Sequence, residues 1–364
     1  MENELKKCLL CPKPFCATCP AGTEVRRIIE LVRAGKIEEA GAVLFDNNPL
    51  SAITGAVCPN HLYCKGACVL SKKGDAVDFS KVEREVSRQF LEHVPKTTSR
   101  ANGKKVLIAG SGPAGLSLSY YLAKAGFSVT IFEKEQKLGG MMRYGIPDFR
   151  LDKSLIDKVA ERLKSMGVKF RTGMEVDLDN LPKGYDITVL AIGAWVSRKL
   201  EIEGEQFSIP GLEFLKHGNC KGGNVVVIGG GNVAVDCALT AVALGAAAVD
   251  VCYRKDESAM KAYPEEIALA KKKGVNFKFN MVPKRISEEK NVPHVIVFDC
   301  FGKEECIRAD HIIVAIGQTA TKDGMLEAAN LGKNVFAIGD AVTGPSTIVQ
   351  AVAQAKELAG ILLE

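Results

Sequence analysis

The residues of this chain that are best suited to chemistry are its cysteines. Seven of the twelve lie within the first seventy residues. Such crowding suits disulfides, zinc ligation or an iron–sulfur cluster. Disulfides are typical of small secreted domains, whereas the N-terminal MENELKK lacks an export signal and seven is an odd number, which favours metal ligation. The seven residues are Cys8, Cys11, Cys16, Cys19, Cys58, Cys64 and Cys68.

A glycine turn in VLIAGSGPAG, residues 106–115, predicts a dinucleotide site. Gly110 permits a tight turn, Gly112 lets a pyrophosphate approach the backbone, and Gly115 lets helix and strand touch. Glu133 follows at the end of the next apolar stretch, where an acid accepts hydrogen bonds from ribose hydroxyls. The alternative is a glycine-rich turn that binds no nucleotide.

A second glycine turn repeats the first with one difference. Residues 225–255 again contain strand, turn, helix and strand. However, Tyr253 stands where Glu133 stood, and Arg254 and Lys255 follow it. Because two cations suit a 2′-phosphate, we expect this repeat to prefer NADP(H) to NAD(H). The alternative is that both are ordinary surface charges.

Two dinucleotide sites in one chain indicate a flavin and a nicotinamide that exchange a hydride. Cofactors carry such a step, while the protein supplies position and electrostatics. We therefore predict no catalytic acid, base or nucleophile. The five cysteines from Cys220 onward contain no C-x-x-C pair and are interpreted as core or surface thiols.

The elements that position these residues fall into an N-terminal block and an α/β remainder. At 364 residues, with 47% of them hydrophobic, the chain can bury two or three cores. We expect residues 1–100 to be an α-helical domain, with helices over 24–35 and 36–48 and a linker at 95–103. This block has too little apolar mass for a core of its own, so an inorganic group should help to hold it together.

The α/β remainder is expected to hold two Rossmann-type domains, the second inserted in the first. The predicted FAD domain covers 101–220 and 309–364, and the predicted NAD(P)H domain covers 221–308. The net charge of +5 is spread along the chain, so we expect neither nucleic acid nor membrane as a partner. No apolar run approaches about 18 residues, and we expect a cytoplasmic protein.

Taken together, these motifs resemble one family: the small subunit of glutamate synthase and its relatives, including the N-terminal half of dihydropyrimidine dehydrogenase and the large subunit of electron-bifurcating NADH-dependent ferredoxin:NADP oxidoreductases. The likeness spans almost the entire chain. It rests on CLLCPKPFC, GAVCPNHLYCKGACVL, both glycine turns, GGMMRYGIPDFRL, YRKDESAMKAYPEE and AIGDAVTGPSTIVQAVAQAK.

The resemblance implies FAD at the first turn, NADP(H) at the second, and a C-terminal AIGD strand that returns to the FAD domain. Gly339 and Asp340 would then meet the FAD phosphates and ribityl chain, the helix that starts at Thr347 would lie near the flavin ring, and Lys261 would add a cation at the 2′-phosphate. The predicted cofactor-binding residues are Gly110, Gly112, Pro113, Ala114, Gly115, Glu133, Lys134, Gly140, Met141, Arg150, Gly193, Gly339, Asp340, Thr347, Ile348, Val349, Gly229, Gly231, Asn232, Val233, Arg254, Lys255, Lys261, Ala315 and Gly317.

For the cysteines, the resemblance implies two [4Fe-4S] clusters. One would be held by Cys8, Cys11, Cys16 and Cys68, and the other by Cys19, Cys58, Cys64 and Glu83. The run C-x2-C-x4-C-x2-C-P is similar to the ferredoxin run in which a last cysteine, followed by Pro, serves a different cluster from its neighbours. Relatives usually have three residues, not two, before that last cysteine. The alternative for Glu83 is a solvated surface carboxylate.

The predicted function is that of an electron-transfer subunit of an oxidoreductase complex, passing electrons between NADPH, FAD and two [4Fe-4S] clusters. A partner redox subunit, with flavin or iron–sulfur groups of its own, would hold the substrate site, so a hetero-oligomer is expected. One alternative is a flavin-based electron-bifurcating subunit. Two alternatives come from other classes. One is a disulfide reductase, although the redox C-x-x-C motif of that class is missing here. The other is a flavoprotein with a zinc-binding docking module.

Overall fold

The chain forms two compact units. The structure is a computed structural model, and the residues it describes are 1–92, 100–289, 292–321, 325–326 and 332–364. Unit 1 comprises residues 1–143, 148–194 and 323–364. Unit 2 comprises residues 144–147 and 195–322. Within the described ranges, no helix is long and apolar enough to cross a membrane.

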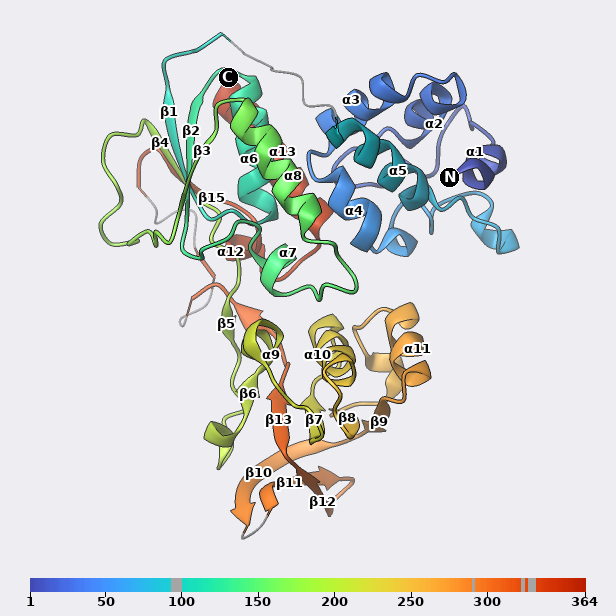
Figure 1. Ribbon diagram of the computed structural model, residues 1–364, viewed down its shortest axis with the longest axis vertical. Coiled ribbons are helices and arrows are strands. Elements are labelled where there is room, and N and C mark those ends of the chain that lie inside the picture. The colour runs from blue at the N-terminus through green and yellow to red at the C-terminus, as the bar shows by residue number, and fades with distance from the viewer. Residues whose placement is uncertain (93–99, 290–291, 322–324, 327–331) are drawn as a thin grey trace. The chain divides into compact units, whose positions relative to one another are not determined.

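The helical part of unit 1 covers the first 92 residues. Its elements are α1 (Glu2–Lys7), α2 (Val25–Arg33), α3 (Ile37–Asn47), α4 (Ser51–Val57), η1 (Asn60–Leu62), η2 (Ser71–Lys73) and α5 (Phe79–Glu92) (Figure 1). Helices α2 and α3 confirm the two that the sequence predicts here. Ile28 and Ile29 on the apolar face of α2 pack with Leu44 of α3 and Val82 of α5. Residues 95–99 of the predicted linker lie outside the described residues.

The rest of unit 1 contains a parallel sheet in the order β15-β4-β1-β2-β3. Its strands are β1 (Lys105–Ala109), β2 (Ser128–Glu133), β3 (Lys169–Thr172), β4 (Ile187–Leu190) and β15 (Val335–Ala337). Helix α6 (Pro113–Lys124) packs on β1 and β2, and both α8 (Ser154–Ser165) and α13 (Ile348–Leu363) pack on α6. Short helices α7 (Met141–Tyr144) and α12 (Asp340–Thr343) complete it. The pairing of β15 with β4 brings the C-terminal segment back to the first glycine turn.

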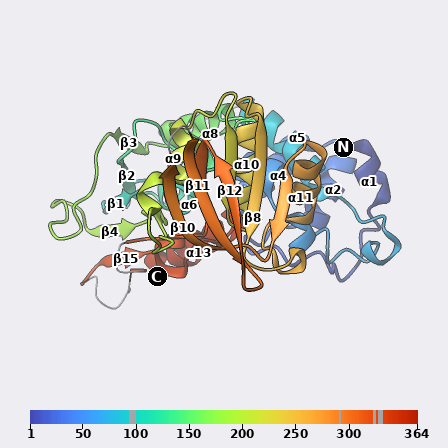
Figure 2. The ribbon, with the colours of Figure 1, turned by 90° about the horizontal axis from the view of Figure 1, so that it is seen from below.

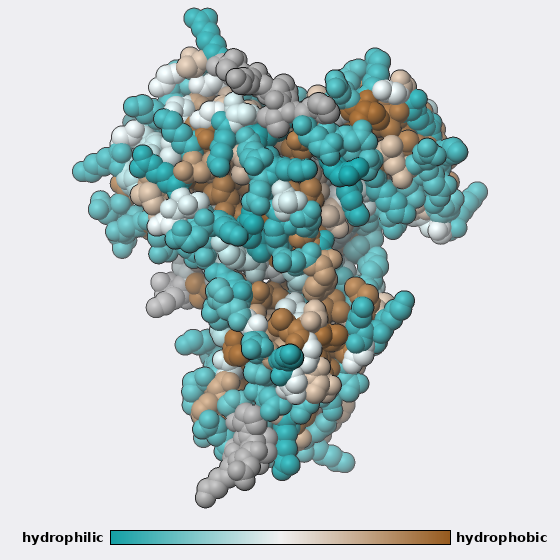
Figure 3. Space-filling model, viewed as in Figure 1, coloured by the Kyte–Doolittle hydropathy of each residue, from teal (hydrophilic) through white to brown (hydrophobic). Residues whose placement is uncertain are grey.

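Unit 2 contains a second parallel sheet in the order β6-β13-β7-β8-β9, beside an antiparallel β10-β11-β12 meander (Figure 2). The strands of the parallel sheet are β6 (Ile209–Pro210), β7 (Asn224–Ile228), β8 (Ala248–Tyr253), β9 (Asn276–Phe279) and β13 (His311–Val314). The meander comprises β10 (Val282–Glu289), β11 (Val292–Cys300) and β12 (Lys303–Ala309). The other elements are β5 (Val196–Ser197), α9 (Gly211–His217), α10 (Asn232–Ala243), α11 (Pro264–Lys272) and β14 (Gln318–Thr319). Hydrophobic residues reach the surface over α9 and α10 in Figure 3.

The compact units divide the chain at other residues than the predicted domains do. Residues 195–220 and 309–322, predicted to belong with the FAD domain, lie in unit 2. The physical reason is strand pairing: β13 hydrogen-bonds in parallel with β7 and β6, so it completes the second sheet. The β13 segment HIIVAIG resembles the β4 segment TVLAIGA in sequence. The two strands can still join different sheets, because strand pairing depends on residues far apart in the chain. Which unit binds which cofactor stays a prediction.

Candidate functional site

The seven cysteines predicted as iron–sulfur ligands lie in two connecting segments of the helical part. Cys8 follows α1 directly, and Cys11, Cys16 and Cys19 lie between α1 and α2. Cys58 ends α4, while Cys64 and Cys68 flank a turn in which a Cβ on Gly66 would overlap the His61 carbonyl. All seven thiols are half-buried and none forms a disulfide.

One set of four thiols faces a common pocket. Cys8, Cys11, Cys16 and Cys68 line it, and Cys64, which the resemblance assigns to the second cluster, lines it too. Burial raises the pKa of the Cys16 thiol above its ordinary value, and the other three thiols raise it further. The fold therefore brings together the four cysteines that the resemblance assigns to the first cluster. Their role as ligands stays a prediction.

A second set contains the other three cysteines and Glu83 of α5. Burial raises the pKa of Cys64 to about 12, with smaller contributions from Glu83, Cys19 and, from the first set, Cys16. The pKa of Cys58 is raised by burial and by Glu83, Cys64 and Cys19. These mutual effects arise only between groups that lie close together. The carboxylate proposed from the resemblance thus lies among the thiols that lack a fourth cysteine.

Glu83 is a buried carboxylate, not the solvated surface residue that its helix would otherwise suggest. Its residue exposure is 7%, and burial raises its pKa to about 7. Both of its hydrogen bonds in the described part of the chain end on Oε1, from Thr54 Oγ1 at 2.7 Å and Asn48 Nδ2 at 3.5 Å. No lysine, arginine or histidine pairs with it among the described residues. A metal cation would compensate this buried charge.

The spacing of the thiols bears on which inorganic group they could hold. Tetrahedral zinc with sulfur ligands at about 2.3 Å would bring the sulfur atoms to about 3.8 Å from one another. Within the described ranges, no three His, Cys, Asp or Glu side chains are arranged to hold one metal ion. Thiols placed around a pocket can instead bind a larger inorganic group.

Two arginines on one face of α2 support the first cysteine segment. Arg26 Nη1 donates to the carbonyls of Cys11 at 3.2 Å and Pro12 at 3.3 Å. Arg33 Nη2 donates to the Cys8 carbonyl at 2.6 Å. Sequence reasoning missed both, although their spacing of seven residues places them on one helical face. They hold the backbone between Cys8 and Cys11, where Leu10 has a left-handed φ of +50°.

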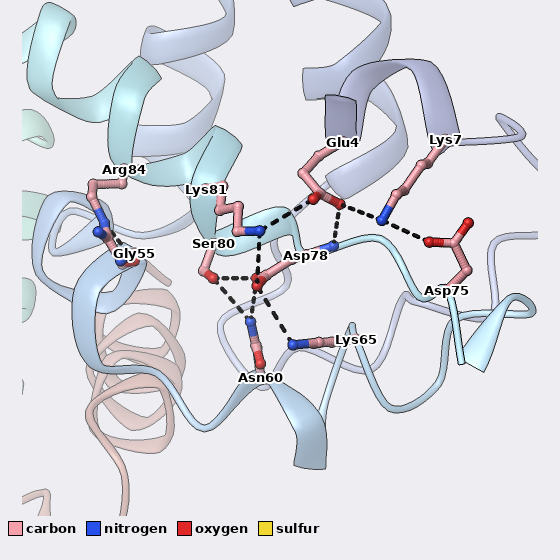
Figure 4. A network of polar contacts seen from close by, with 10 residues as sticks. All are labelled: Glu4, Lys7, Gly55, Asn60, Lys65, Asp75, Asp78, Ser80, Lys81 and Arg84. Carbon is pink, nitrogen blue, oxygen red and sulfur yellow. Dashed lines mark hydrogen bonds and ion pairs between the residues drawn. The ribbon is translucent and has the colours of Figure 1, made fainter. Parts of the chain in front are cut away.

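A polar network fixes the second cysteine segment (Figure 4). Glu4 of α1 accepts from the Asp78 backbone N–H at 2.9 Å and pairs with Lys81 of α5 at 3.3 Å. Asp78 in turn accepts from Asn60 Nδ2 at 2.8 Å, within the turn that joins Cys58 to Cys64. Helix α1, the start of α5 and the cysteine segment are thereby tied together.

The first glycine turn has the open space that a pyrophosphate would need. Gly112 is the N-cap of α6, and a Cβ there would have no heavy atom within 4 Å. In contrast, a Cβ on Gly115 would overlap the Gly110 carbonyl oxygen. A Cβ on Gly140 would lie 2.8 Å from Gly112 Cα, so the two backbones are in contact. The first N–H groups of an α-helix have no partner within the helix, so a helix start of this kind suits an anion.

Glu133 is held by the turn that it serves. Its Oε2 accepts from the backbone N–H of Ser111 at 2.9 Å and from Ser111 Oγ at 2.6 Å. The same hydroxyl oxygen accepts from the Gly139 N–H at 3.0 Å. Sequence reasoning missed Ser111, because it occupies a variable position of the glycine pattern. The hydroxyl of Ser111 could have indicated this role, because the Glu133 carboxylate needs hydrogen-bond donors close by.

The C-terminal segment adds a second wall to this turn. Gly339 has φ +76°, and a Cβ added there would lie 3.0 Å from Ala114 Cβ. Asp340 Oδ1 accepts from the backbone N–H and hydroxyl of Ser346 at 3.0 and 2.8 Å, and burial raises its pKa. Thr347 caps α13 through a reciprocal box with Gln350, which fixes the helix start.

A hydrogen bond joins the second cysteine segment to the start of α13. Tyr63 Oη and Thr347 Oγ1 are 3.2 Å apart. Tyr63 directly precedes Cys64, and Thr347 begins the stretch that the resemblance places near the flavin ring. Nearby, Lys356 Nζ of α13 donates to the Ala21 carbonyl at 3.4 Å. The predicted cluster and flavin sites are therefore neighbours within unit 1.

The remaining predicted FAD residues lie around the same sheet edge. Ala114 is buried and Gly193 has φ +71° in the segment after β4. Ile348 and Val349 occupy the first turn of α13. Pro113 is the first residue of α6, Met141 starts α7, Arg150 is half-buried between α7 and α8, and Lys134 is exposed after β2.

The second glycine turn, in unit 2, repeats the geometry of the first. Gly231 is the N-cap of α10, and a Cβ there would again meet open space. The Lys261 N–H donates to the Gly230 carbonyl at 2.8 Å, so Lys261 lies at the turn. Arg254 and Lys255 are exposed after β8, and no ion pair is formed by either within the described part of the chain. Three cations are thus available for a phosphate.

Several neighbours keep this turn in shape. Asn232 Oδ1 accepts from the Tyr263 N–H at 2.9 Å, and Val233 follows it in the first turn of α10. A Cβ on Gly229 would overlap the Ala315 carbonyl. Gly317 has φ +117° beyond β13. Sequence reasoning missed Gly230, which must lack a side chain because the Tyr253 ring packs on it.

Comparison with known families agrees with this architecture. The pyridine nucleotide-disulphide oxidoreductase profile matches residues 54–184 and 104–355. The profile of dihydropyrimidine dehydrogenase domain II, 4Fe-4S cluster, matches residues 1–94. The chain therefore belongs to the pyridine nucleotide-disulphide oxidoreductase family, with an N-terminal [4Fe-4S] domain, and is an FAD- and iron–sulfur-dependent oxidoreductase. The family and fold class predicted from the sequence are confirmed.

Curated relatives extend over nearly all of this chain. The oxidoreductase AegA of Escherichia coli is 32% identical over 98% of the chain, which spans 64% of that protein. The glutamate synthase [NADPH] small chain of Escherichia coli is 29% identical over 98% of the chain and 90% of that protein. The NADP(+)-dependent formate dehydrogenase subunit beta of Moorella thermoacetica is 30% identical over 95% of the chain and 59% of that protein.

Solved structures with lower identity show the fold. Lactococcus lactis thioredoxin reductase has a TM-score of 0.59 at 24% identity, over 71% of this chain and 99% of that one. A 2-naphthoyl-CoA reductase has a TM-score of 0.63 at 21% identity, over 94% of this chain and 49% of that one. The longer of these matches takes in the N-terminal helical part as well.

Proposed function

We propose that this chain is the electron-transfer subunit of an oxidoreductase complex, passing electrons between NADP(H), FAD, two [4Fe-4S] clusters and a partner subunit that holds the substrate site. When bound, the flavin exchanges a hydride with the nicotinamide, and the clusters carry single electrons. Two relatives are named as a small chain and as a subunit beta, which supports a partner for this chain too.

The observation that carries the proposal is the junction between the cysteine segments and α13. Two sets of four candidate ligands form in the helical part, and the second is joined to Thr347 through Tyr63. Electron transfer between the flavin and a cluster requires the two sites to lie close together. The open glycine turns with their free N–H groups support binding of both dinucleotides.

The residues of the chain bind and orient, and none needs to exchange a proton with substrate. The start of α6 would receive the FAD pyrophosphate, and Glu133 would accept from its ribose while Ser111 holds it in place. In unit 2, Arg254, Lys255 and Lys261 would bind the 2′-phosphate that distinguishes NADP(H).

The test is analysis of the protein purified without oxygen. We expect FAD, iron and acid-labile sulfide in amounts that fit two [4Fe-4S] clusters, and loss of the brown cluster absorbance when NADPH is added. Protein that contains zinc but no labile sulfide would refute the proposal. Failure of NADPH to bleach a cluster whose reduction potential lies above that of NADPH would refute the route through the flavin.

A further inference from the structure

Large apolar side chains surround the first cysteine set on the outside of the molecule. Leu9 is 63% exposed, Phe15 67% and Val69 39%. Each is the immediate neighbour in sequence of a cysteine of that set. All three line the same pocket as those cysteines, so they form one face, which we call the cysteine face. The unusual feature is that apolar residues are exposed together there.

The cysteine face is bordered by positive charge. The two segments that form it, residues 5–22 and 58–74, contain six lysines and no carboxylate. Lys7 pairs with Asp75 at 2.7 Å and Lys65 with Asp78 at 3.5 Å. The other four are exposed and form no ion pair within the described residues; they are Lys6, Lys13, Lys72 and Lys73. Four cations without ion pairs therefore lie on the two segments that carry the exposed apolar residues.

We propose that the cysteine face docks an acidic one-electron carrier protein or carrier domain, with Leu9, Phe15 and Val69 at the centre of the contact. The inference rests on the proposed function, because it locates the exit of the electron route. An apolar centre with a charged rim is the usual anatomy of a protein interface. Redox encounters are small and are guided by opposite charges, which the lysines supply. A basic carrier would be repelled.

The test measures binding of the cluster-loaded chain to a plant-type [2Fe-2S] ferredoxin, used as an acidic probe, with basic cytochrome c as the opposite probe. We expect ferredoxin to bind, and its Kd to rise at least about tenfold as salt increases from about 0.02 to 0.2 M, because screening shortens the reach of the lysines. Cytochrome c should not bind. Failure of ferredoxin to bind, or equal binding of both probes, would overturn the proposal.

Variants locate the contact. Lys13→Glu/Lys72→Glu should weaken ferredoxin binding at least about tenfold, and Phe15→Ser should weaken it several-fold with little change in salt dependence. Lys169→Glu/Lys183→Glu makes the same charge change on exposed residues of the flavin part and should alter the Kd less than about twofold. Equal effects of the two double variants would contradict the proposed face.

Reduction of the clusters by NADPH, measured separately, distinguishes failure of the docking proposal from failure of the proposed function. In both lysine double variants, bleaching of the clusters by NADPH should match wild type, since that step does not require the partner. If wild type itself lacks this bleaching, the proposed function fails. If bleaching is intact and Lys13→Glu/Lys72→Glu binds ferredoxin as tightly as wild type, only the docking proposal fails.

Discussion

Replacing Gly112 and Gly115 with alanine, one at a time, tests whether the first glycine turn binds FAD. The two positions have opposite surroundings. Gly112 has φ −67° and ψ −173°, which alanine adopts without strain, and a methyl group there would enter open space. At Gly115 the methyl group would overlap the Gly110 carbonyl oxygen and lie 3.3 Å from Ile108 Cγ2. Only the second change disturbs the protein itself.

The expected magnitudes follow from these contacts. Overpacking at Gly115 should cost about 1–3 kcal/mol of stability. Gly112→Ala should leave stability unchanged or raise it by about 0.4–1 kcal/mol, because the unfolded chain loses freedom. If the methyl group displaces the pyrophosphate, a charge-assisted hydrogen bond worth about 1.5–3 kcal/mol is lost. The Kd for FAD would then rise by about 10- to 150-fold.

The assay combines two measurements on flavin-free protein. Thermal unfolding reports stability, and quenching of flavin fluorescence during titration gives the Kd for FAD. We expect Gly112→Ala to lose affinity while keeping its Tm, and Gly115→Ala to lose both. Wild-type affinity in Gly112→Ala would refute the placement of the pyrophosphate at this turn. A lowered Tm in Gly112→Ala would refute the steric reasoning.

Three further predictions concern the other candidate residues. Glu83→Ala should lower the iron content and change the EPR spectrum of the reduced clusters, whereas Glu85→Ala on the same helix should do neither; full iron with an unchanged spectrum would exclude Glu83 as a ligand. Arg254→Ala should raise the KM for NADPH about tenfold but not that for NADH, and an unchanged KM for NADPH would contradict the phosphate site. Tyr63→Phe removes the hydroxyl that contacts α13 and should slow NADPH-driven bleaching several-fold with both cofactors retained. Tyr121→Phe also loses one hydroxyl hydrogen bond but should leave the bleaching rate unchanged. Equal bleaching rates in the two variants would exclude an electron route through the contact between Tyr63 and α13.

Features that depend on local rules could be predicted from the sequence. The glycine turns follow from backbone geometry that only glycine allows, and the two repeats indeed leave the same open space at Gly112 and Gly231. Helix α2 follows from its apolar spacing and from Gly35, which ends it with φ +73°. Each of these patterns is complete within about thirty residues, so no distant partner is needed to recognise it.

Features that depend on long-range packing could not be predicted in the same way. Nothing local distinguishes Glu83 from the exposed charges of α5, and its burial arises only when α4 supplies Thr54 and the cysteines gather beside it. The supporting arginines, Arg26 and Arg33, bind backbone carbonyls that carry no sequence signature. Likewise, β13 joins the second sheet through strand pairing, which hydrophobicity alone does not specify.

Polar and aromatic contacts join the helical part of unit 1 to the part that contains its parallel sheet; we call the residues that make them the seam. The seam consists of Phe45, Asp46, Tyr120, Lys124 and Arg162. Tyr120 Oη donates to Asp46, Lys124 Nζ lies 2.6 Å from the same carboxylate, and the buried Arg162 guanidinium lies 4.9 Å from the Phe45 ring centroid. Since this seam contains none of the predicted ligands, it can fix the distance between the cysteine segments and α13 without taking part in chemistry.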